Sequence, residues 1–383
     1  MTLTACGHRR ARRGSGCDAA PDPRRAPAAQ AVGHTVAFVG RPWMVPKAKA
    51  LGFDTFPAGS DRGLTPVRRP LVAPDVERER REFGAGFGGR IARERAADIL
   101  PLCAAWRPDV LVCEETDFGA MVAAERLGLP HATVLVFAAG GFAQPAFVAE
   151  PLDTVRAEHG LPPDPELAML TRGPVLSPFP PNLRDPRFPL PAPVQGYRVL
   201  EPEPIVEEGT TWVAAPADAP LVYFTLGTVF PLESGDVFQR VIAGLRELPI
   251  RLLVTVGRDF DPAALGPQPP NVRVERYIPQ AQLLPHCRLV VCHAGSGSLM
   301  GALTHGLPMA LIPMGADQPL NAARCAALGV ARTLDAVTLT PEAARETVAA
   351  LLADGAYRQA AERLRDEIAA LPSAAEVVRL LEQ

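Results

Sequence analysis

The segment His293-Ala-Gly-Ser-Gly-Ser298 decides the fold of this 383-residue chain. It follows the apolar run Leu289-Val-Val-Cys292 and precedes a run with helical spacing, and a further apolar run begins at Met309. Strand, small-residue loop, helix and strand in this length are typical of one βαβ unit. The loop then lies at the carboxyl end of the first strand, which is the edge where open α/β sheets bind their ligands.

The same segment has the features of an anion site. Gly295 and Gly297 would let a phosphate approach the backbone, and Ser298 adds a hydroxyl donor. The helix start presents unpaired N–H groups, and His293 can donate from its ring to a phosphate oxygen. A buried histidine beside a tight turn is the alternative. We favour the pyrophosphate of an activated nucleotide because these features occur together.

The strand after this helix ends just before Asp317-Gln318, which brings a carboxylate and an amide to the same sheet edge. Such a pair suits hydrogen bonding to the hydroxyls of a sugar. Asp317 directly before Gln318-Pro319 is also a good helix cap, and both roles can hold together.

A nicotinamide-dependent oxidoreductase is the competing interpretation. The spacing Gly295-x-Gly297-x-x-x-Gly301 partly imitates a dinucleotide fingerprint, with Asp317 as its acid, but the third glycine comes one residue late. A P-loop is excluded because no Gly-Lys-Ser/Thr occurs.

Strands alternate with helices on both sides of this unit, which predicts an α/β protein with two Rossmann-like, doubly wound parallel sheets. We expect a first domain over residues 31–200, a linker over 201–219 and a second domain over 220–383. The predicted strands are Thr35–Val39, Asp109–Cys113, Ala132–Phe137, Leu221–Leu226, Arg251–Thr255, Val272–Val274, Leu289–Cys292 and Met309–Pro313. Residues 1–30 carry six arginines and few bulky aliphatic side chains, so we expect them to be disordered or non-native.

Composition narrows the class of partner. A formal net charge of −3 gives no electrostatic attraction to nucleic acid. The seven cysteines never form a CxxC, so neither a disulfide framework nor a zinc site is expected, and a cytoplasmic protein fits best. The longest uncharged run, 132–149, holds two glycines and a proline and is expected to be a strand and a loop, without membrane insertion.

The second half of the chain resembles the GT-B glycosyltransferases, in particular the nucleotide-sugar-dependent enzymes of bacterial natural-product pathways related to UDP-glycosyltransferases. The resemblance rests on residues that keep their order and spacing over some fifty positions: Arg276-Tyr-Ile-Pro-Gln280, Leu283-Leu-Pro-His286, His293-x-Gly-x-Gly-Ser298, Gly306-Leu-Pro308, Pro313, Asp317-Gln318 and Asn321-Ala322. It implies two domains facing a cleft, with a TDP- or UDP-sugar in the second domain and a hydrophobic acceptor in the first.

The resemblance also implies roles for individual residues. His293, Gly295, Gly297, Ser298 and Thr228 would hold the diphosphate. Tyr277 and Ile278 would face the base, although Tyr277 could equally be a core aromatic. Asp317 and Gln318 would hold the sugar. No metal or other cofactor is implied, and the only Asp-x-Asp pair, Asp259-Phe-Asp261, is expected to be a solvated loop.

The implied reaction is an inverting transfer to a hydroxyl group, in which a histidine backed by a carboxylate removes the acceptor's proton. Glu114 matches the carboxylate and Asp117 is its alternative, although either could be a solvated loop acid. The expected histidine is missing about sixteen residues before Gly33-His34, and His8 is the only upstream candidate.

Two further expectations follow from this missing histidine. Residues 1 to about 30 would not be the native segment, and activity would be impaired. A non-catalytic nucleotide-sugar-binding homologue is therefore a second interpretation. Independently of the histidine, we expect a monomer or homodimer.

Overall fold

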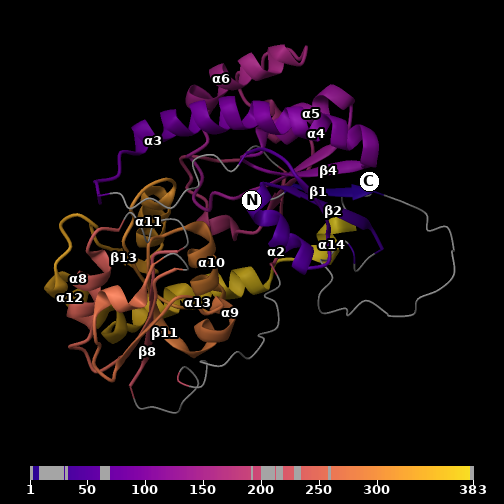
Figure 1. The fold of residues 1–383 in the computed structure, drawn as a ribbon. Coiled ribbons are helices and arrows are strands. Elements are labelled where there is room, and N and C mark those ends of the chain that lie inside the picture. The colour runs from indigo at the N-terminus through magenta and orange to yellow at the C-terminus, as the bar shows by residue number, and fades with distance from the viewer. Residues whose placement is uncertain are drawn as a thin grey trace.

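The computed structural model describes residues 3–7, 30, 33–60, 70–190, 193–199, 212, 219–227, 234–257 and 260–379. Two sheets, each covered by helices, occupy the first and second halves of the chain (Figure 1). The predicted α/β class with two Rossmann-like sheets is confirmed. The predicted linker falls almost wholly outside the described residues.

The first sheet has seven strands in the order β3-β2-β1-β4-β5-β6-β7. Their bounds are β1 Leu3–Gly7, β2 Thr35–Gly40, β3 Asp54–Pro57, β4 Val110–Glu114, β5 His131–Val134, β6 Val175–Ser177 and β7 Val194–Gly196. The helices of this half are α2 Val45–Ala50, α3 Val76–Phe83, the π-helix η2 Gly84–Ile91, α4 Ala92–Trp106, α5 Phe118–Leu127 and α6 Pro145–Glu158. Figure 1 shows α3 and α4 as parts of one long rod across this domain.

The strand β1 corrects two expectations. Residues 1–30 were expected to be disordered or non-native; Leu3–Gly7 form a strand, so disorder is wrong for this segment, and its being non-native stays a prediction. The strand runs antiparallel to both neighbours, pairing Leu3 with Val39 and Cys6 with Val110, so the first sheet is not wholly parallel. The sequence did not predict it, because a strand of five residues is too short to establish a period.

The second sheet has six strands in the order β10-β9-β8-β11-β12-β13, all parallel. Their bounds are β8 Leu221–Thr225, β9 Arg251–Thr255, β10 Val272–Glu275, β11 Cys287–Cys292, β12 Met309–Leu311 and β13 Ala331–Thr333. The helices are α8 Val237–Leu245, α9 Gln280–Leu283, α10 Ser296–Thr304, α11 Gln318–Ala327, α12 Pro341–Ala353, α13 Gly355–Ala369 and α14 Ala374–Val378. Counted along the chain this is the order 3-2-1-4-5-6, which places the topological switch point between β8 and β11.

Some elements were not predicted from the sequence. Within the predicted first domain, β6 and β7 are two additional strands, and α6 includes the last five residues of the uncharged run 132–149. The end of the chain, predicted as part of the second domain, returns to the first: Arg198 N–H donates to Pro372 O at 2.7 Å, and Arg198 pairs with Ser373. Periodicity cannot predict these edge elements, because strands of three residues are too short to show one.

The described residues contain no helix that is both long and apolar enough to cross a bilayer. The five cysteines described with side chains are buried and free.

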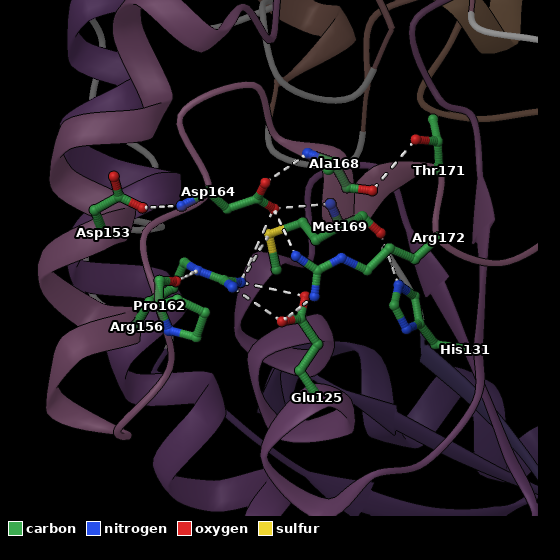
Figure 2. Close-up of polar contacts among 10 residues, drawn as sticks. All are labelled: Glu125, His131, Asp153, Arg156, Pro162, Asp164, Ala168, Met169, Thr171 and Arg172. Carbon is green, nitrogen blue, oxygen red and sulfur yellow. Dashed lines mark hydrogen bonds and ion pairs between the residues drawn. The ribbon is translucent and has the colours of Figure 1, made fainter.

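A buried network of charges fixes the loop after α6 (Figure 2). The guanidinium of Arg156 has no exposed surface; it donates to both carboxylate oxygens of Glu125, at 3.2 and 3.0 Å, and to Pro162 O at 2.8 Å. Arg172 adds a second cation, 2.6 Å from Glu125. Asp164 accepts two backbone N–H bonds, from residues 168 and 169, at 2.8 Å each. This network holds the loop against α5 and α6.

Replacing Arg156 should destabilise the protein strongly. Arg156→Ala leaves Glu125 and Asp164 as buried carboxylates with fewer partners, so we expect a loss of about 3–5 kcal/mol in the free energy of unfolding, measured by urea denaturation. Arg93→Ala is the matched control, because Arg93 also pairs with a glutamate, Glu158, but both side chains are more than 40% exposed. The control should cost less than about 1 kcal/mol. Equal losses in the two variants would contradict the role of the buried network.

Candidate functional site

The loop between β11 and α10 lies at the switch point of the second sheet. Ala294 takes a left-handed backbone with φ of 65°, and Gly295 is the N-cap of α10. The helix starts at Ser296. Ser296, Gly297 and Ser298 therefore form its first turn, whose N–H groups have no acceptor within the helix. This is the arrangement that binds anions at helix starts.

The ring of His293 is held between two glycines. A Cβ on Gly227, which follows β8, would lie 2.5 Å from Cε1 and 2.7 Å from Nε2 of the ring. A Cβ on Gly295 would lie 3.0 Å from Cε1 and closer still to Nε2. Neither position can therefore carry a side chain without moving the histidine. Thr228, predicted to contact the diphosphate, lies outside the described residues.

His293 is buried, with only 8% of its surface exposed. Burial lowers its pKa from 6.5 to about 4, so the ring is neutral at pH 7 and keeps one N–H donor. The alternative of a buried histidine is therefore confirmed, and the contact of His293 with a diphosphate stays a prediction.

Gly297 differs from the other two glycines. A Cβ added there would meet no protein atom within 4 Å. Packing within this chain therefore does not require a glycine at this position, whereas the close approach of a ligand would.

Asp317 belongs to a polar cluster that we call the hub, made of Ser296, Asp317 and Asn321. The hydroxyl of Ser296 donates to Asp317 Oδ2 at 2.9 Å, and Asn321 Nδ2 donates to the same oxygen at 2.7 Å. Burial raises the pKa of Asp317, and these two hydrogen bonds oppose the rise. Asp317 stands at the N-cap position of α11 but its side chain makes no capping bond, so the helix-cap alternative is wrong for its side chain.

Gln318 is 2% exposed, and its Oε1 accepts the N–H of Met314 at 2.8 Å. The sugar contact predicted for this residue would therefore fall to its amide nitrogen. The geometry brings Asp317 and Gln318 to the same edge as the His293 loop, as predicted, because β11 and β12 are adjacent and parallel.

The residues predicted to face the base follow β10. Tyr277 is 50% exposed, so the alternative that it is a core aromatic is wrong. Its neighbour Ile278 is 8% exposed and packs in the core with Leu283 and Leu299. The exposed ring of Tyr277, next to the buried Ile278, is available for stacking on a base.

The two carboxylates predicted for the first domain, Glu114 and Asp117, are buried, so the alternative of a solvated loop acid is wrong. Glu114 ends β4, is 7% exposed, and burial raises its pKa. Glu115 accepts the N–H groups of Val136 and Phe137 at 2.9 and 3.2 Å. Asp117 is paired with Arg95, whose Nε lies at 2.8 Å, and caps α5. Asp117 is thus held by Arg95 and by the start of α5, and the catalytic role of Glu114 or Asp117 stays a prediction.

His8 lies outside the described residues. Gly7, directly before it, pairs with Thr35 at the start of β2, so β1 ends at the edge opposite Glu114. The described histidines of this domain are His34, which precedes β2, His131, which begins β5 at the same opposite edge, and His159, which ends α6. The histidine expected beside Glu114 is not found in the described part of the chain.

Asp261, of the Asp-x-Asp pair, lies 3.2 Å from Arg276 and is mostly exposed. The described residues contain no cluster of three or more His, Cys, Asp or Glu able to hold a metal ion.

Comparison with known proteins identifies the family. The family model described as "Erythromycin biosynthesis protein CIII-like, C-terminal domain" matches residues 239–383. The 4'-demethylrebeccamycin synthase of Lentzea aerocolonigenes is 30% identical over 329 residues, which are 76% of this chain and 77% of that protein. The chain belongs to the natural-product glycosyltransferases of the UDP-glycosyltransferase-like superfamily. This glycosyltransferase is also 26% identical to the 10-deoxymethynolide desosaminyltransferase of Streptomyces venezuelae, over 92% of this chain and 91% of that protein.

Solved structures agree with this membership. Spinosyn Rhamnosyltransferase SpnG matches with a TM-score of 0.78 at 28% identity, covering 93% of this glycosyltransferase and 94% of that chain. Its complex with thymidine diphosphate matches with the same TM-score, at 26% identity and the same coverage. The predicted GT-B fold is therefore confirmed.

Three residues of the site were given no role from the sequence: Ser296, Asn321 and Glu79. Asn321 had appeared only as part of a motif, and its spacing of four residues from Asp317 on α11 was a usable signal. Glu79 on α3 accepts the N–H of Ala316, next to Asp317, and no local pattern indicates that contact.

The buried histidine should make stability depend on pH. Because burial lowers the pKa of His293 to about 4, the unfolded chain binds its proton at a higher pH than the folded protein does. His293 therefore does not reduce the free energy of unfolding above about pH 6.5, but it lowers that free energy by about 3 kcal/mol as the pH drops to 4. Urea unfolding of the protein and of His293→Gln between pH 4 and 7 measures it. The variant should lose less stability on acidification, and parallel curves would contradict the prediction.

Proposed function

We propose that this glycosyltransferase moves a sugar from a TDP- or UDP-sugar to a hydroxyl group of a hydrophobic natural product, with inversion at the anomeric carbon. The observation that carries the proposal is the loop at the start of α10. It combines a clamped His293, an unobstructed Gly297 and, one strand away, the carboxylate of Asp317. A nucleotide diphosphate and a sugar need these groups in this order.

The donor would bind along the carboxyl edge of the second sheet. The diphosphate would accept N–H groups from Ser296, Gly297 and Ser298, and the neutral ring of His293 would donate to it as charge builds up on leaving. Tyr277, half exposed, would stack on the base. One solved structure of SpnG is a complex with thymidine diphosphate, which supports TDP as the first nucleotide to test. No metal or further cofactor is part of this proposal.

The acceptor would lie against aromatic side chains of the first domain. Phe83 packs against Phe87, Phe137 and Phe142, with ring centroids 4.7, 5.9 and 5.2 Å apart. Phe87 and Phe137 keep part of their surfaces exposed, and Phe137 follows β5 at the edge that holds Glu114. An apolar wall beside a buried carboxylate suits a hydrophobic molecule that presents a hydroxyl group. The relatives support this class, since another structure of SpnG is a complex with the spinosyn aglycone.

The acceptor's proton would leave through Glu114. Its buried position at the end of β4 raises its pKa, which makes it a stronger base than an exposed carboxylate. As the proton leaves, the acceptor oxygen would form a bond to the anomeric carbon, and the bond from that carbon to the diphosphate would break on the opposite face. The electron pair of the broken bond stays on the diphosphate, where His293 and the start of α10 stabilise it.

A thermal-shift panel tests the proposal. TDP and UDP should raise the melting temperature, while NAD and NADP should leave it unchanged. His293→Ala should abolish the shift, because the ring that faces the diphosphate is lost. His159→Ala, at the end of α6 in the first domain, is the control and should keep the shift. Protection by NAD would contradict the proposal in favour of an oxidoreductase. Nucleotide binding without turnover on any acceptor would favour a non-catalytic homologue.

Gly297→Ala separates ligand binding from folding. The new methyl group meets no protein atom within 4 Å, and alanine in a helix is more stable than glycine by about 0.5–1 kcal/mol. We therefore expect a slightly higher melting temperature together with at least tenfold weaker TDP binding, measured by calorimetry. Gly86→Ala, in the π-helix of the first domain, is the control, because its Cβ also has open space. Unchanged TDP affinity in Gly297→Ala would contradict the assigned approach of the diphosphate.

A further inference from the structure

Asn321 lies where three loops of the two domains meet. It stands on the first turn of α11 and has no exposed surface. Its Nδ2 donates to Asp317 Oδ2 at 2.7 Å and to the carbonyl of Ala294 at 3.0 Å. Its Oδ1 accepts the N–H of Ala139, in the loop between β5 and α6, at 3.0 Å. One carboxamide thus connects the diphosphate loop, the sugar loop and the first domain.

A second bond runs beside this one. The N–H of Ala138 donates to the hydroxyl of Ser296 at 3.1 Å, and that hydroxyl donates in turn to Asp317. Two successive N–H groups of the first domain are therefore satisfied by the hub. The same loop continues from Phe137, a member of the aromatic wall proposed for the acceptor.

The chemistry of the position requires an amide. Asn321 must donate to a carboxylate and to a carbonyl while it accepts from a backbone N–H, and only a carboxamide of this length supplies both. An aspartate would keep the acceptor for Ala139 but would place a second carboxylate against Asp317. An alanine would leave the N–H of Ala139, the carbonyl of Ala294 and the carboxylate of Asp317 each with one partner fewer.

We infer that Asn321 is a positioning residue for sugar transfer: it orients Asp317 toward the donor sugar and fixes the acceptor-side loop relative to it. The inference rests on the proposed sugar contact of Asp317. Asn321 itself need touch neither substrate. Because its bonds reach the loops on both sides of the transfer, its loss should affect the sugar and the reaction more than the binding of the nucleotide.

Calorimetry with TDP and TDP-glucose tests the inference on the full chain. In the unaltered protein the sugar should add to the affinity. In Asn321→Ala and Asn321→Asp the affinity for TDP should stay within about threefold, while the gain from the sugar is lost. With an accepted donor and acceptor, kcat should fall 10- to 100-fold, because small displacements of positioned groups cost this much. The aspartate variant is nearly isosteric and guards against a failure to fold.

Asn182→Ala is the matched control. Asn182 also bridges the two halves of the chain, donating to Glu367 at 2.8 Å, but it is exposed and contacts neither donor loop. It should leave both affinities and kcat unchanged. Loss of TDP and TDP-glucose binding by the same factor in the Asn321 variants would show a merely structural role and overturn the inference. Equal affinities for TDP and TDP-glucose in the unaltered protein would overturn the sugar contact on which it rests. An absence of any TDP binding would instead contradict the proposed function.

Discussion

Backbone N–H groups, rather than pairs of charged side chains, join the two domains at the site. Ala138 and Ala139 of the first domain donate to Ser296 and Asn321, and Ala316 of the second donates to Glu79. Such bonds depend on the position of the backbone, so they form only when both loops have their native conformation. The position of the donor loops relative to the acceptor side is therefore coupled to the fold of each loop, and two left-handed residues, Ala294 and Ala316, stand in the middle of this arrangement.

Burial determines the electrostatics of the site. His293 is kept neutral, while Glu114, Glu115 and Asp317 have raised pKa values because each is withdrawn from water. Hydrogen bonds from N–H and O–H groups compensate the carboxylates. A diphosphate entering this site would meet neutral donors and a helix start, and these hold an anion without a fixed positive side chain.

Both sheets have the strand order 3-2-1-4-5-6, to which the first sheet adds β7. They differ in the direction of one strand. In the second sheet all strands are parallel, so β8 and β11 both end at the switch point and bring Gly227 against His293. In the first sheet β1 is antiparallel to both neighbours, so β1 ends at the other edge. The end of β1 therefore does not lie beside Glu114 in the way that Gly227 lies beside His293. The carboxylate of Glu114 is at the expected edge, at the end of β4.

The sequence by itself determined the second domain well, because each of its βαβ units is encoded within about thirty neighbouring residues. Strand ends, the glycine loop and Asp317 follow from that local order, and the family motifs lie in the same stretch. The tertiary structure alone decided the direction of β1, the burial of Glu114 and Asp117, and the partners of Asn321. Ser296 and Ala138 are 158 residues apart and Glu79 and Ala316 are 237 apart, so no periodicity relates them. Such contacts depend on how the two folded domains pack against each other, which a local sequence pattern does not predict.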